Sequence, residues 1–137
     1  MIKIHGACHC GNIAFEADLN VDNVGICHCT DCQTLSASAF RTLAIVKSED
    51  FRLIKGRPQE YVKTGDSGNT RIQAFCANCG SGIYATNGVG PPVSFNIRVG
   101  TLAQRASLEP RFECWSHSRL PWVEPLENTL KSEGNPQ

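Results

Sequence analysis

Residues 27–32, Cys27-His28-Cys29-Thr30-Asp31-Cys32, place three cysteines within six positions, and no other stretch says more about the fold. Two further clusters lie on either side of it. They are a CxC, Cys8-His9-Cys10-Gly11, and a CxxC with a following glycine, Cys76-Ala77-Asn78-Cys79-Gly80. Cys114 stands alone. Seven of the eight cysteines therefore occur at the short spacings that are typical of metal ligands.

These spacings have a geometric meaning. In an extended segment, residues i and i+2 point to the same side, so a CxC directs both sulfurs toward one point. A CxxC closes a tight turn with the same result, and a following glycine supplies the permissive backbone that such turns need. Structural zinc takes four ligands, whereas a group of three leaves a position open, as in catalytic sites. The sequence predicts a group of four and a group of three, and spacing alone leaves the pairing of the clusters open.

Composition restricts the classes of function. Thirteen Lys and Arg residues balance thirteen Asp and Glu residues, so the formal net charge is zero. This balance argues against binding to nucleic acid or to an anionic membrane by charge alone. The first residues lack the apolar segment of a signal peptide, and no window reaches the roughly 18 apolar residues of a membrane helix. We therefore expect a cytoplasmic protein with reduced thiols, which favours metal binding over disulfides.

Zinc binding has two alternatives at the clustered cysteines, a redox role and binding of another metal. A redox CxxC of the thioredoxin type would follow a strand and begin a helix in a βαβ unit, and the sequence has no such pattern. Iron or another metal at the three-cysteine cluster stays open, although sulfur ligands favour zinc. Cys114 is predicted to be a small buried apolar residue.

The pattern along the chain predicts a mainly β protein of one domain, residues 1–126, with a polar tail, residues 127–137, that frays. Alternating apolar residues place Ile13, Phe15, Ala17 and Leu19 on one strand face, and Val93, Phe95, Ile97 and Val99 on another. A helix is predicted at Gln33–Ser38 and a hairpin loop at Thr64–Asn69. The predicted strands are Ile2–Ile4, Asn12–Leu19, Ala39–Val46, Phe51–Ile54, Glu60–Lys63, Arg71–Phe75, Gly82–Thr86 and Val93–Val99.

Four polar side chains near the clusters also received predictions. His9 and His28 each lie between two cysteines, so their rings should point away from the metal and pack or support the ligands. Asp31 is expected to cap or stabilise a turn. Arg41 is expected to be a solvated surface residue, with binding of a substrate carboxylate as the alternative.

The order and spacing of the clusters resemble those of the glutathione-dependent formaldehyde-activating enzyme family, also called the GFA or CENP-V family. The resemblance runs from Ile4 to Trp122. The matching motifs are Gly6-Ala7-Cys8-His9-Cys10-Gly11, Cys27-His28-Cys29-Thr30-Asp31-Cys32, Phe75-Cys76-Ala77-Asn78-Cys79-Gly80-Ser81, Val99-Gly100-Thr101-Leu102 and Leu120-Pro121-Trp122.

The resemblance implies an Mss4-like fold of small twisted antiparallel sheets organised around zinc. It also implies two zinc ions per chain. Cys8, Cys10, Cys76 and Cys79 would share a structural zinc, and Cys27, Cys29 and Cys32 would hold a catalytic one. The implied activity is that of a carbon–sulfur lyase, which forms or cleaves the adduct of glutathione, or a similar small thiol, with formaldehyde or another small aldehyde.

Two alternatives remain beside this enzyme. One is a non-catalytic zinc module that carries glutathione or another thiol. The other is a zinc-ribbon-like module for nucleic acid or protein, which predicts a basic stripe with interleaved aromatic residues. The sequence has no such stripe. The substrate and the oligomeric state are left open by the sequence.

Overall fold

Two β-sheets make up most of the structure. The computed structural model describes residues 1–65 and 68–135. The smaller sheet is antiparallel, with the strand order β1 (Ile2–Ala7), β2 (Ala14–Leu19) and β5 (Phe51–Lys55). The larger sheet has the order β11 (Leu130–Lys131), β10 (Phe112–Cys114), β3 (Val24–Cys27), β4 (Arg41–Lys47), β9 (Ser94–Arg98), β8 (Gly82–Asn87), β7 (Thr70–Phe75) and β6 (Gln59–Thr64). The prediction of a mainly β fold is confirmed.

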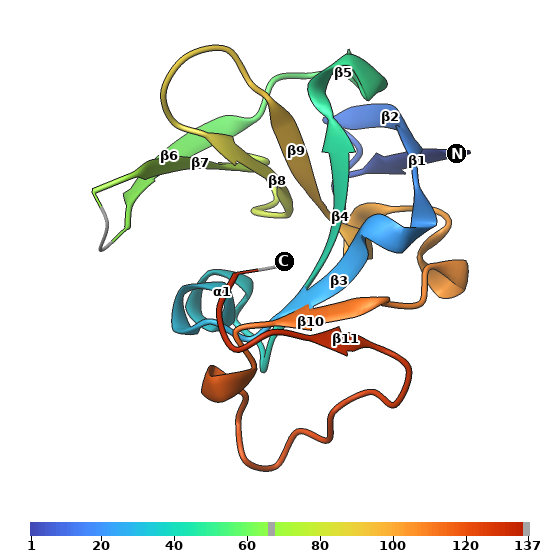
Figure 1. Cartoon of the computed structure of the whole chain (residues 1–137). Helices are drawn as coiled ribbons and strands as arrows, with labels where there is room; N and C mark the ends of the chain where they lie inside the picture. Colours follow the sequence, from blue (N-terminus) through green and yellow to red (C-terminus); the bar gives the residue numbers. More distant parts are fainter. Residues whose placement is uncertain (66–67, 136–137) are drawn as a thin grey trace.

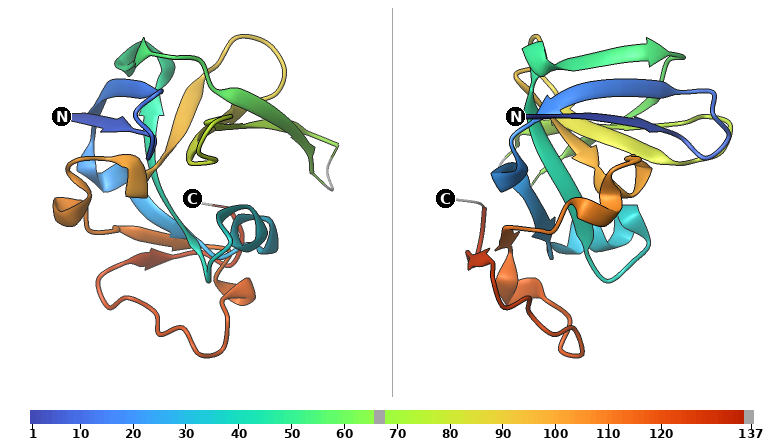
Figure 2. Two further views of the ribbon diagram at one scale, coloured as in Figure 1. Left: turned by 180° about the vertical axis from the view of Figure 1, so that it is seen from behind. Right: turned by 90° about the vertical axis from the view of Figure 1, so that its right-hand side faces the viewer.

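The smaller sheet and the helix α1 (Thr30–Ser36) lie on opposite sides of β4 (Figures 1 and 2). The predicted hairpin of β6 and β7 is present, with Thr64 paired to Thr70, although Asp66 and Ser67 lie outside the described residues. None of the helices among residues 1–65 and 68–135 has the length and hydropathy needed to cross a membrane.

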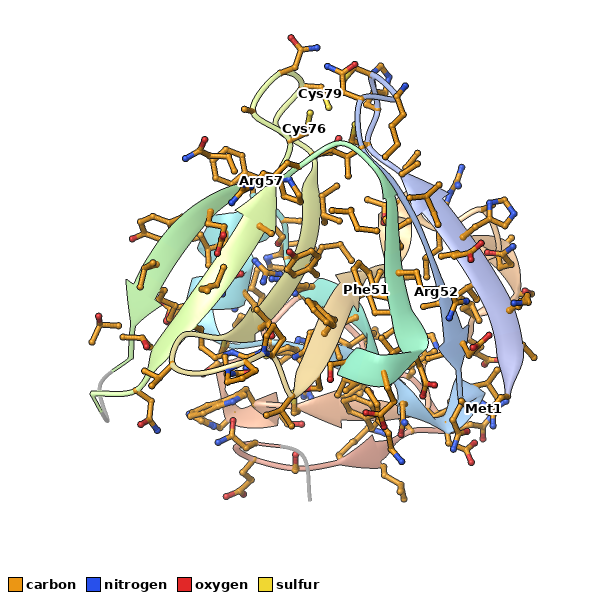
Figure 3. All side chains as sticks on the ribbon, turned by 90° about the horizontal axis from the view of Figure 1, so that it is seen from above. Met1, Phe51, Arg52, Arg57, Cys76 and Cys79 are labelled. Atoms are coloured by element: carbon orange, nitrogen blue, oxygen red, sulfur yellow. The ribbon has the colours of Figure 1, made fainter. Side chains whose placement is uncertain are left out.

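The core lies between the two sheets. On β2, Phe15, Ala17 and Leu19 are at most 1% exposed, as the alternation predicted. Phe51 of β5 lies between Phe15 and Phe95, with ring centroids 5.6 Å and 4.4 Å away, and so joins the two sheets (Figure 3). The aromatic residues are offset-stacked, an arrangement that adds to the burial of their apolar surface.

One residue of the predicted β9 face is exposed. Phe95, Ile97 and Val99 are buried as expected, but Val93 is 73% exposed. The strand begins only at Ser94. The Val93 N–H donates to the side-chain oxygen of Asn87 (2.9 Å), and this contact belongs to the connecting loop.

Strand β3 was missed by the sequence analysis. All four of its residues are buried, so it shows no alternation between apolar and polar residues. Gly25 explains why a small residue occurs here. A Cβ atom at Gly25 would lie 2.3 Å from the ring of Phe112 on β10, so a larger residue here would displace this ring.

The helix begins three residues before the predicted start, because Cys29 is its N-cap. The Cys32 N–H donates to Cys29 Sγ (3.3 Å), and the Gln33 N–H donates to the Cys29 carbonyl (3.0 Å). The helix ends at Ser36, and its C-cap is Ala37, whose φ of 52° is left-handed. Asp31 and Cys32 therefore lie in the first helical turn, where the Asp31 carboxylate pairs with Lys63 (2.7 Å), whereas the cap expected of Asp31 is supplied by Cys29.

The expectation of a frayed tail is wrong for the last described residues. Strand β11 pairs in parallel with β10, and β10 pairs in parallel with β3, so the larger sheet is mixed rather than antiparallel. The backbone groups of the tail find partners here. The Leu130 N–H donates to the Arg111 carbonyl (3.0 Å), and the Trp115 N–H donates to the Gly134 carbonyl (2.8 Å).

A buried pair of polar side chains joins β10 to residues 27–29. Glu113 is 2% exposed and His28 is fully buried, and Glu113 Oε1 lies 2.9 Å from His28 Nε2. Glu113 Oε2 accepts hydrogen bonds from the Thr129 hydroxyl (2.6 Å) and the Leu126 N–H (3.1 Å). Burial opposes ionisation, but these hydrogen bonds outweigh it and lower the pKa of Glu113. The prediction that His28 packs rather than ligates agrees with this position.

We expect Glu113→Ala to lower the free energy of unfolding by about 3 kcal/mol, because it leaves His28 buried without its partner. His28 Nδ1 already lacks a hydrogen bond among the described residues. Urea denaturation followed by circular dichroism measures the effect. The matched control is Glu109→Ala at an exposed glutamate, which should change the value by less than about 0.5 kcal/mol. Equal effects of the two substitutions would show that the ion pair does not stabilise the fold.

The difference in stability between wild type and Glu113→Ala should also depend on pH. A carboxylate with a lowered pKa stabilises the folded state above its ordinary value, about 4.3, and loses this contribution as the pH falls through the lowered pKa. The difference in stability between wild type and Glu113→Ala should therefore be constant above about pH 5 and become smaller in acid. A difference that grows in acid would contradict the assignment.

Gly56 fixes the end of β5 against the loop that carries Cys8 and Cys10. Its φ is +77°, and a Cβ atom there would lie 2.1 Å from the Asn12 carbonyl oxygen. Gly90 has the same φ with nothing within 4 Å. Gly90→Ala should therefore cost only the backbone strain, about 1–2 kcal/mol. Gly56→Ala should cost at least twice as much, as measured by thermal denaturation. Equal losses of stability in the two variants would mean that the protein relieves the contact between the new Cβ atom and the Asn12 carbonyl oxygen.

Candidate metal centres

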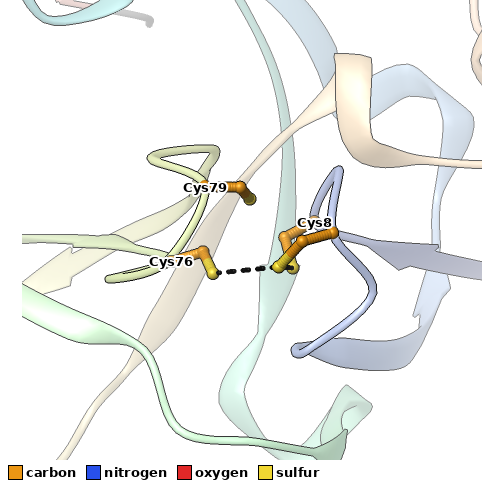
Figure 4. A group of neighbouring side chains, drawn as sticks. Cys8, Cys76 and Cys79 are labelled. Atoms are coloured by element: carbon orange, nitrogen blue, oxygen red, sulfur yellow. Dashed lines mark hydrogen bonds between the residues drawn. The ribbon is translucent and has the colours of Figure 1, made fainter.

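Four thiols from two loops meet at one end of the molecule. Cys8 and Cys10 follow β1 in the smaller sheet, and Cys76 and Cys79 lie in the turn between β7 and β8 of the larger sheet. All four Sγ atoms lie within 4.8 Å of one another. Figure 3 shows the position of this turn, and Figure 4 shows Cys76 and Cys79 facing Cys8 across the two loops.

The separations of these sulfurs fit a tetrahedral zinc site. Cys8 Sγ lies 3.6 Å from Cys10 Sγ, which lies 3.7 Å from Cys76 Sγ. A zinc–sulfur bond of about 2.3 Å gives an edge of about 3.8 Å between sulfurs in a regular tetrahedron. The four thiols can therefore hold a tetrahedral metal ion without a large movement of either loop.

The backbone of each loop directs its sulfurs inward. In the first loop, the Cys8 N–H donates to the Ile13 carbonyl (3.0 Å), and the Ile13 N–H donates to Cys8 Sγ (3.2 Å). In the second, the Gly80 N–H donates to the Cys76 carbonyl (2.8 Å). The turn then leaves the cluster through Gly80, whose φ of +81° is the left-handed conformation expected of a glycine after a CxxC.

Hydrogen bonds favour the thiolate form of Cys79 and Cys10 in this group. The pKa of Cys79 is lowered to about 5, first by a hydrogen bond from the Ser81 side chain (3.3 Å) and then by backbone N–H groups. The pKa of Cys10 is lowered, mainly by a hydrogen bond from the Asn78 side chain. Because metals bind thiolates, these contacts prepare the group for a cation.

The second group of thiols comprises Cys27, Cys29 and Cys32, whose Sγ atoms also lie within 4.8 Å of one another. Cys27 ends β3, Cys29 caps α1, and Cys32 lies in its first turn. Hydrogen bonds from Cys27 and Cys32 lower the pKa of Cys29. The pKa values of Cys27 and Cys32 are raised, because their protons are held by neighbouring thiols. A divalent cation would allow all three to ionise together.

Cys114 lies beside this second group. It is 3% exposed, which agrees with the predicted small buried residue, and the parallel pairing of β10 with β3 places it opposite Cys27. Its Sγ donates weakly to the Ile26 carbonyl (3.5 Å) and contacts the Cys27 thiol. It does not share the mutual 4.8 Å separation of the three thiols, so the group remains one of three.

The three thiols open onto a cleft, and this distinguishes them from the group of four. Cys27, Cys29 and Cys32 line a cavity of about 930 Å³ together with Cys114, and none of the cysteines in the group of four does. Lys63 also faces the cavity, and its ammonium group lies 2.7 Å from the Asp31 carboxylate. A volume of this size is ample for a small-molecule ligand.

Three arginines line the same cleft, and the sequence analysis considered a ligand site only for Arg41, as the less favoured alternative. Arg41, predicted to be a solvated surface residue, is only 7% exposed, so that expectation is wrong. The reason is that β4 turns this residue toward β7, where Arg41 Nη1 donates to Gln73 Oε1 (3.2 Å). Arg71 of β7 and Arg98 of β9 complete the set.

One signal in the sequence points to these residues. Arg71 and Gln73 are two positions apart in a predicted strand, as are Asn96 and Arg98, so each pair faces the side opposite to the apolar residues. A face of this kind is usually solvated. Only the curvature of the larger sheet brings these residues to one cleft. His9, by contrast, is exposed, whereas its ring was expected to pack or to support the ligands.

Comparisons with known proteins agree with these features. A protein of Rhodobacter sphaeroides with a known crystal structure has a similar fold, with a TM-score of 0.56 and 19% sequence identity, over 93% of this chain and 99% of that one. At this identity the likeness concerns the fold alone. The family model of the glutathione-dependent formaldehyde-activating enzyme matches residues 3–118, which include seven of the motif cysteines and Cys114. The chain therefore belongs to the glutathione-dependent formaldehyde-activating enzyme family.

Proposed function

We propose that this protein is a zinc-dependent carbon–sulfur lyase that forms or cleaves the adduct of a small thiol with a small aldehyde. The observation that carries this proposal is the difference between the two thiol groups. One group has four thiols and is away from the cleft, whereas the other has three and lines it. A site of three protein ligands beside a cavity is the arrangement in which zinc has a position left for substrate.

The proposed roles follow from this difference. Cys8, Cys10, Cys76 and Cys79 hold a structural zinc, and Cys27, Cys29 and Cys32 hold a catalytic one, which makes two per chain. The name of the family supports glutathione as the thiol and formaldehyde as the aldehyde. A zinc ion at the three-cysteine site would supply the positive charge that keeps a thiol ionised at neutral pH.

The residues of the cleft contribute charge and position. Arg41 and Arg98 place positive charge around the three thiols, which favours a substrate in its thiolate form. Addition forms a sulfur–carbon bond and breaks the carbonyl π bond, and the proton of the thiol ends on the former carbonyl oxygen. The reverse reaction cleaves the carbon–sulfur bond. Holding the thiolate beside the aldehyde in a cleft accelerates a step that otherwise needs a bimolecular encounter.

Metal content tests the two sites. Elemental analysis of protein purified without chelators should give two zinc ions per chain. Cys29→Ser should reduce this to one while the circular dichroism spectrum is retained, because the four-thiol group is separate. Cys114→Ala, which removes the neighbouring thiol that is outside both groups, should retain two. A wild-type content of one that Cys29→Ser does not change would contradict a metal site at Cys27, Cys29 and Cys32.

Exchange spectroscopy tests the reaction itself. In a mixture of glutathione, formaldehyde and their adduct, the zinc-loaded protein should increase the exchange rate measured by nuclear magnetic resonance above the spontaneous rate. Cys29→Ser should lose the whole increase, and Cys114→Ala should keep most of it. Binding of glutathione without any acceleration would reject the enzyme in favour of a thiol carrier.

A further inference from the structure

Three guanidinium groups converge at the cleft without a carboxylate partner. Gln73 Oε1 accepts hydrogen bonds from both Arg41 Nη1 and Arg98 Nη2, and Arg71 lies two residues before Gln73 on β7. Among residues 1–65 and 68–135, none of the three arginines forms an ion pair with an acidic side chain. The nearby Lys63, in contrast, is paired with Asp31.

This arrangement is unfavourable for the protein alone. Arg41 is 7% exposed, and Arg71 and Arg98 are half-buried. Burial, followed by the charge of Arg41, lowers the pKa of Arg98 to about 9, and burial lowers that of Arg71. Buried charges in proteins are normally paired, so three partly buried cations in one cleft indicate that a negatively charged ligand completes the site.

The three thiols do not supply enough negative charge. Three thiolates around a divalent cation carry a net charge of −1, whereas the three arginines carry +3. The Lys63 and Asp31 pair is neutral. The site therefore retains about two positive charges, which a ligand with two carboxylates would balance.

The position of the arginines indicates which part of a ligand they would contact. Arg41, Gln73 and Arg98 also line a second cavity of about 770 Å³, which extends toward Gly80 and Ser81. They line both cavities, so they stand where the space next to the thiols continues into this second space. If the sulfur of a ligand lies at Cys29, the part of the ligand that is remote from the sulfur would lie beside the arginines.

We propose that Arg41 and Arg98, positioned by Gln73, form together with Arg71 a carboxylate subsite that selects thiols with acidic groups remote from the sulfur. The sulfur end of this assignment rests on the proposed function. Arginine suits the role because its planar fork forms two parallel hydrogen bonds with a carboxylate.

The test uses a ligand that lacks a thiol, so that binding at the arginines is separate from the reaction. Titration calorimetry compares S-methylglutathione, which has two carboxylates, with its diethyl ester on the zinc-loaded protein. We expect the diacid to bind at least tenfold more tightly than the ester. Equal affinities would overturn the subsite.

Arg98→Met should weaken binding of the diacid at least tenfold, as expected for loss of a charge-assisted hydrogen bond, and should leave binding of the ester unchanged. Arg57→Met, at an exposed arginine outside both cavities, is the matched control and should alter neither. The melting temperature of Arg98→Met should equal or exceed that of the wild type, because the substitution removes an unpaired buried charge. A lower melting temperature, with unchanged affinity for the diacid, would assign Arg98 a purely structural role and overturn the proposal.

Two outcomes separate this proposal from the function on which it rests. Binding of the diacid that depends on Arg98, without acceleration of thiol–aldehyde exchange, would reject the lyase and retain the subsite. Acceleration that is equal for glutathione and its diethyl ester would retain the lyase and reject the subsite. Displacement of the diacid by inorganic phosphate at equal concentration would show a general anion site and overturn selection of a carboxylate substrate.

Discussion

The meeting of two cysteine loops is the contact on which the rest of the structure depends. One loop, with Cys8 and Cys10, belongs to the smaller sheet, and the other, with Cys76 and Cys79, belongs to the larger sheet. Their four thiols close one end of the space between the sheets, which the aromatic side chains around Phe51 fill. Because the second loop connects β7 to β8, the same contact sets the position of the strand that carries residues 71–73.

The second cysteine group depends on a different set of contacts. It is formed where β3 ends and α1 begins. His28, which lies between Cys27 and Cys29, contacts Glu113 in the interior of the protein and so anchors this segment to β10. Glu113 is in turn bonded to Thr129, so the tail of the chain contributes to the surroundings of the three thiols. The front of the group faces the cleft and its arginines. The two groups thus differ in surroundings as well as in the number of ligands, which agrees with one structural and one reactive role.

Much of the β structure could be predicted because its information is local. The alternation from Ile13 to Leu19 gives both the strand and its buried face, and the pattern from Phe95 to Val99 does the same. The prediction was poorer where burial covers both faces or where pairing joins distant segments. Strand β3 has no alternation, and β10 and β11 are two or three residues long and are held by parallel partners. Nothing near Leu130 in the sequence indicates these partners.

The sequence by itself determined the three cysteine clusters and the direction of their sulfurs, because the CxC and CxxC spacings act through backbone geometry within a few residues. Which clusters meet in space was left open by the spacing, and the tertiary structure brings Cys8 and Cys10 to Cys76 and Cys79. Only the tertiary structure decided what surrounds them. Cys114 lies beside Cys27 because β10 runs parallel to β3, and Arg41 faces Gln73 because the larger sheet curves β7 toward β4. These contacts join residues 32 positions apart (Arg41 and Gln73) and 87 positions apart (Cys27 and Cys114). Strand order and curvature, which no short stretch of sequence encodes, bring them together.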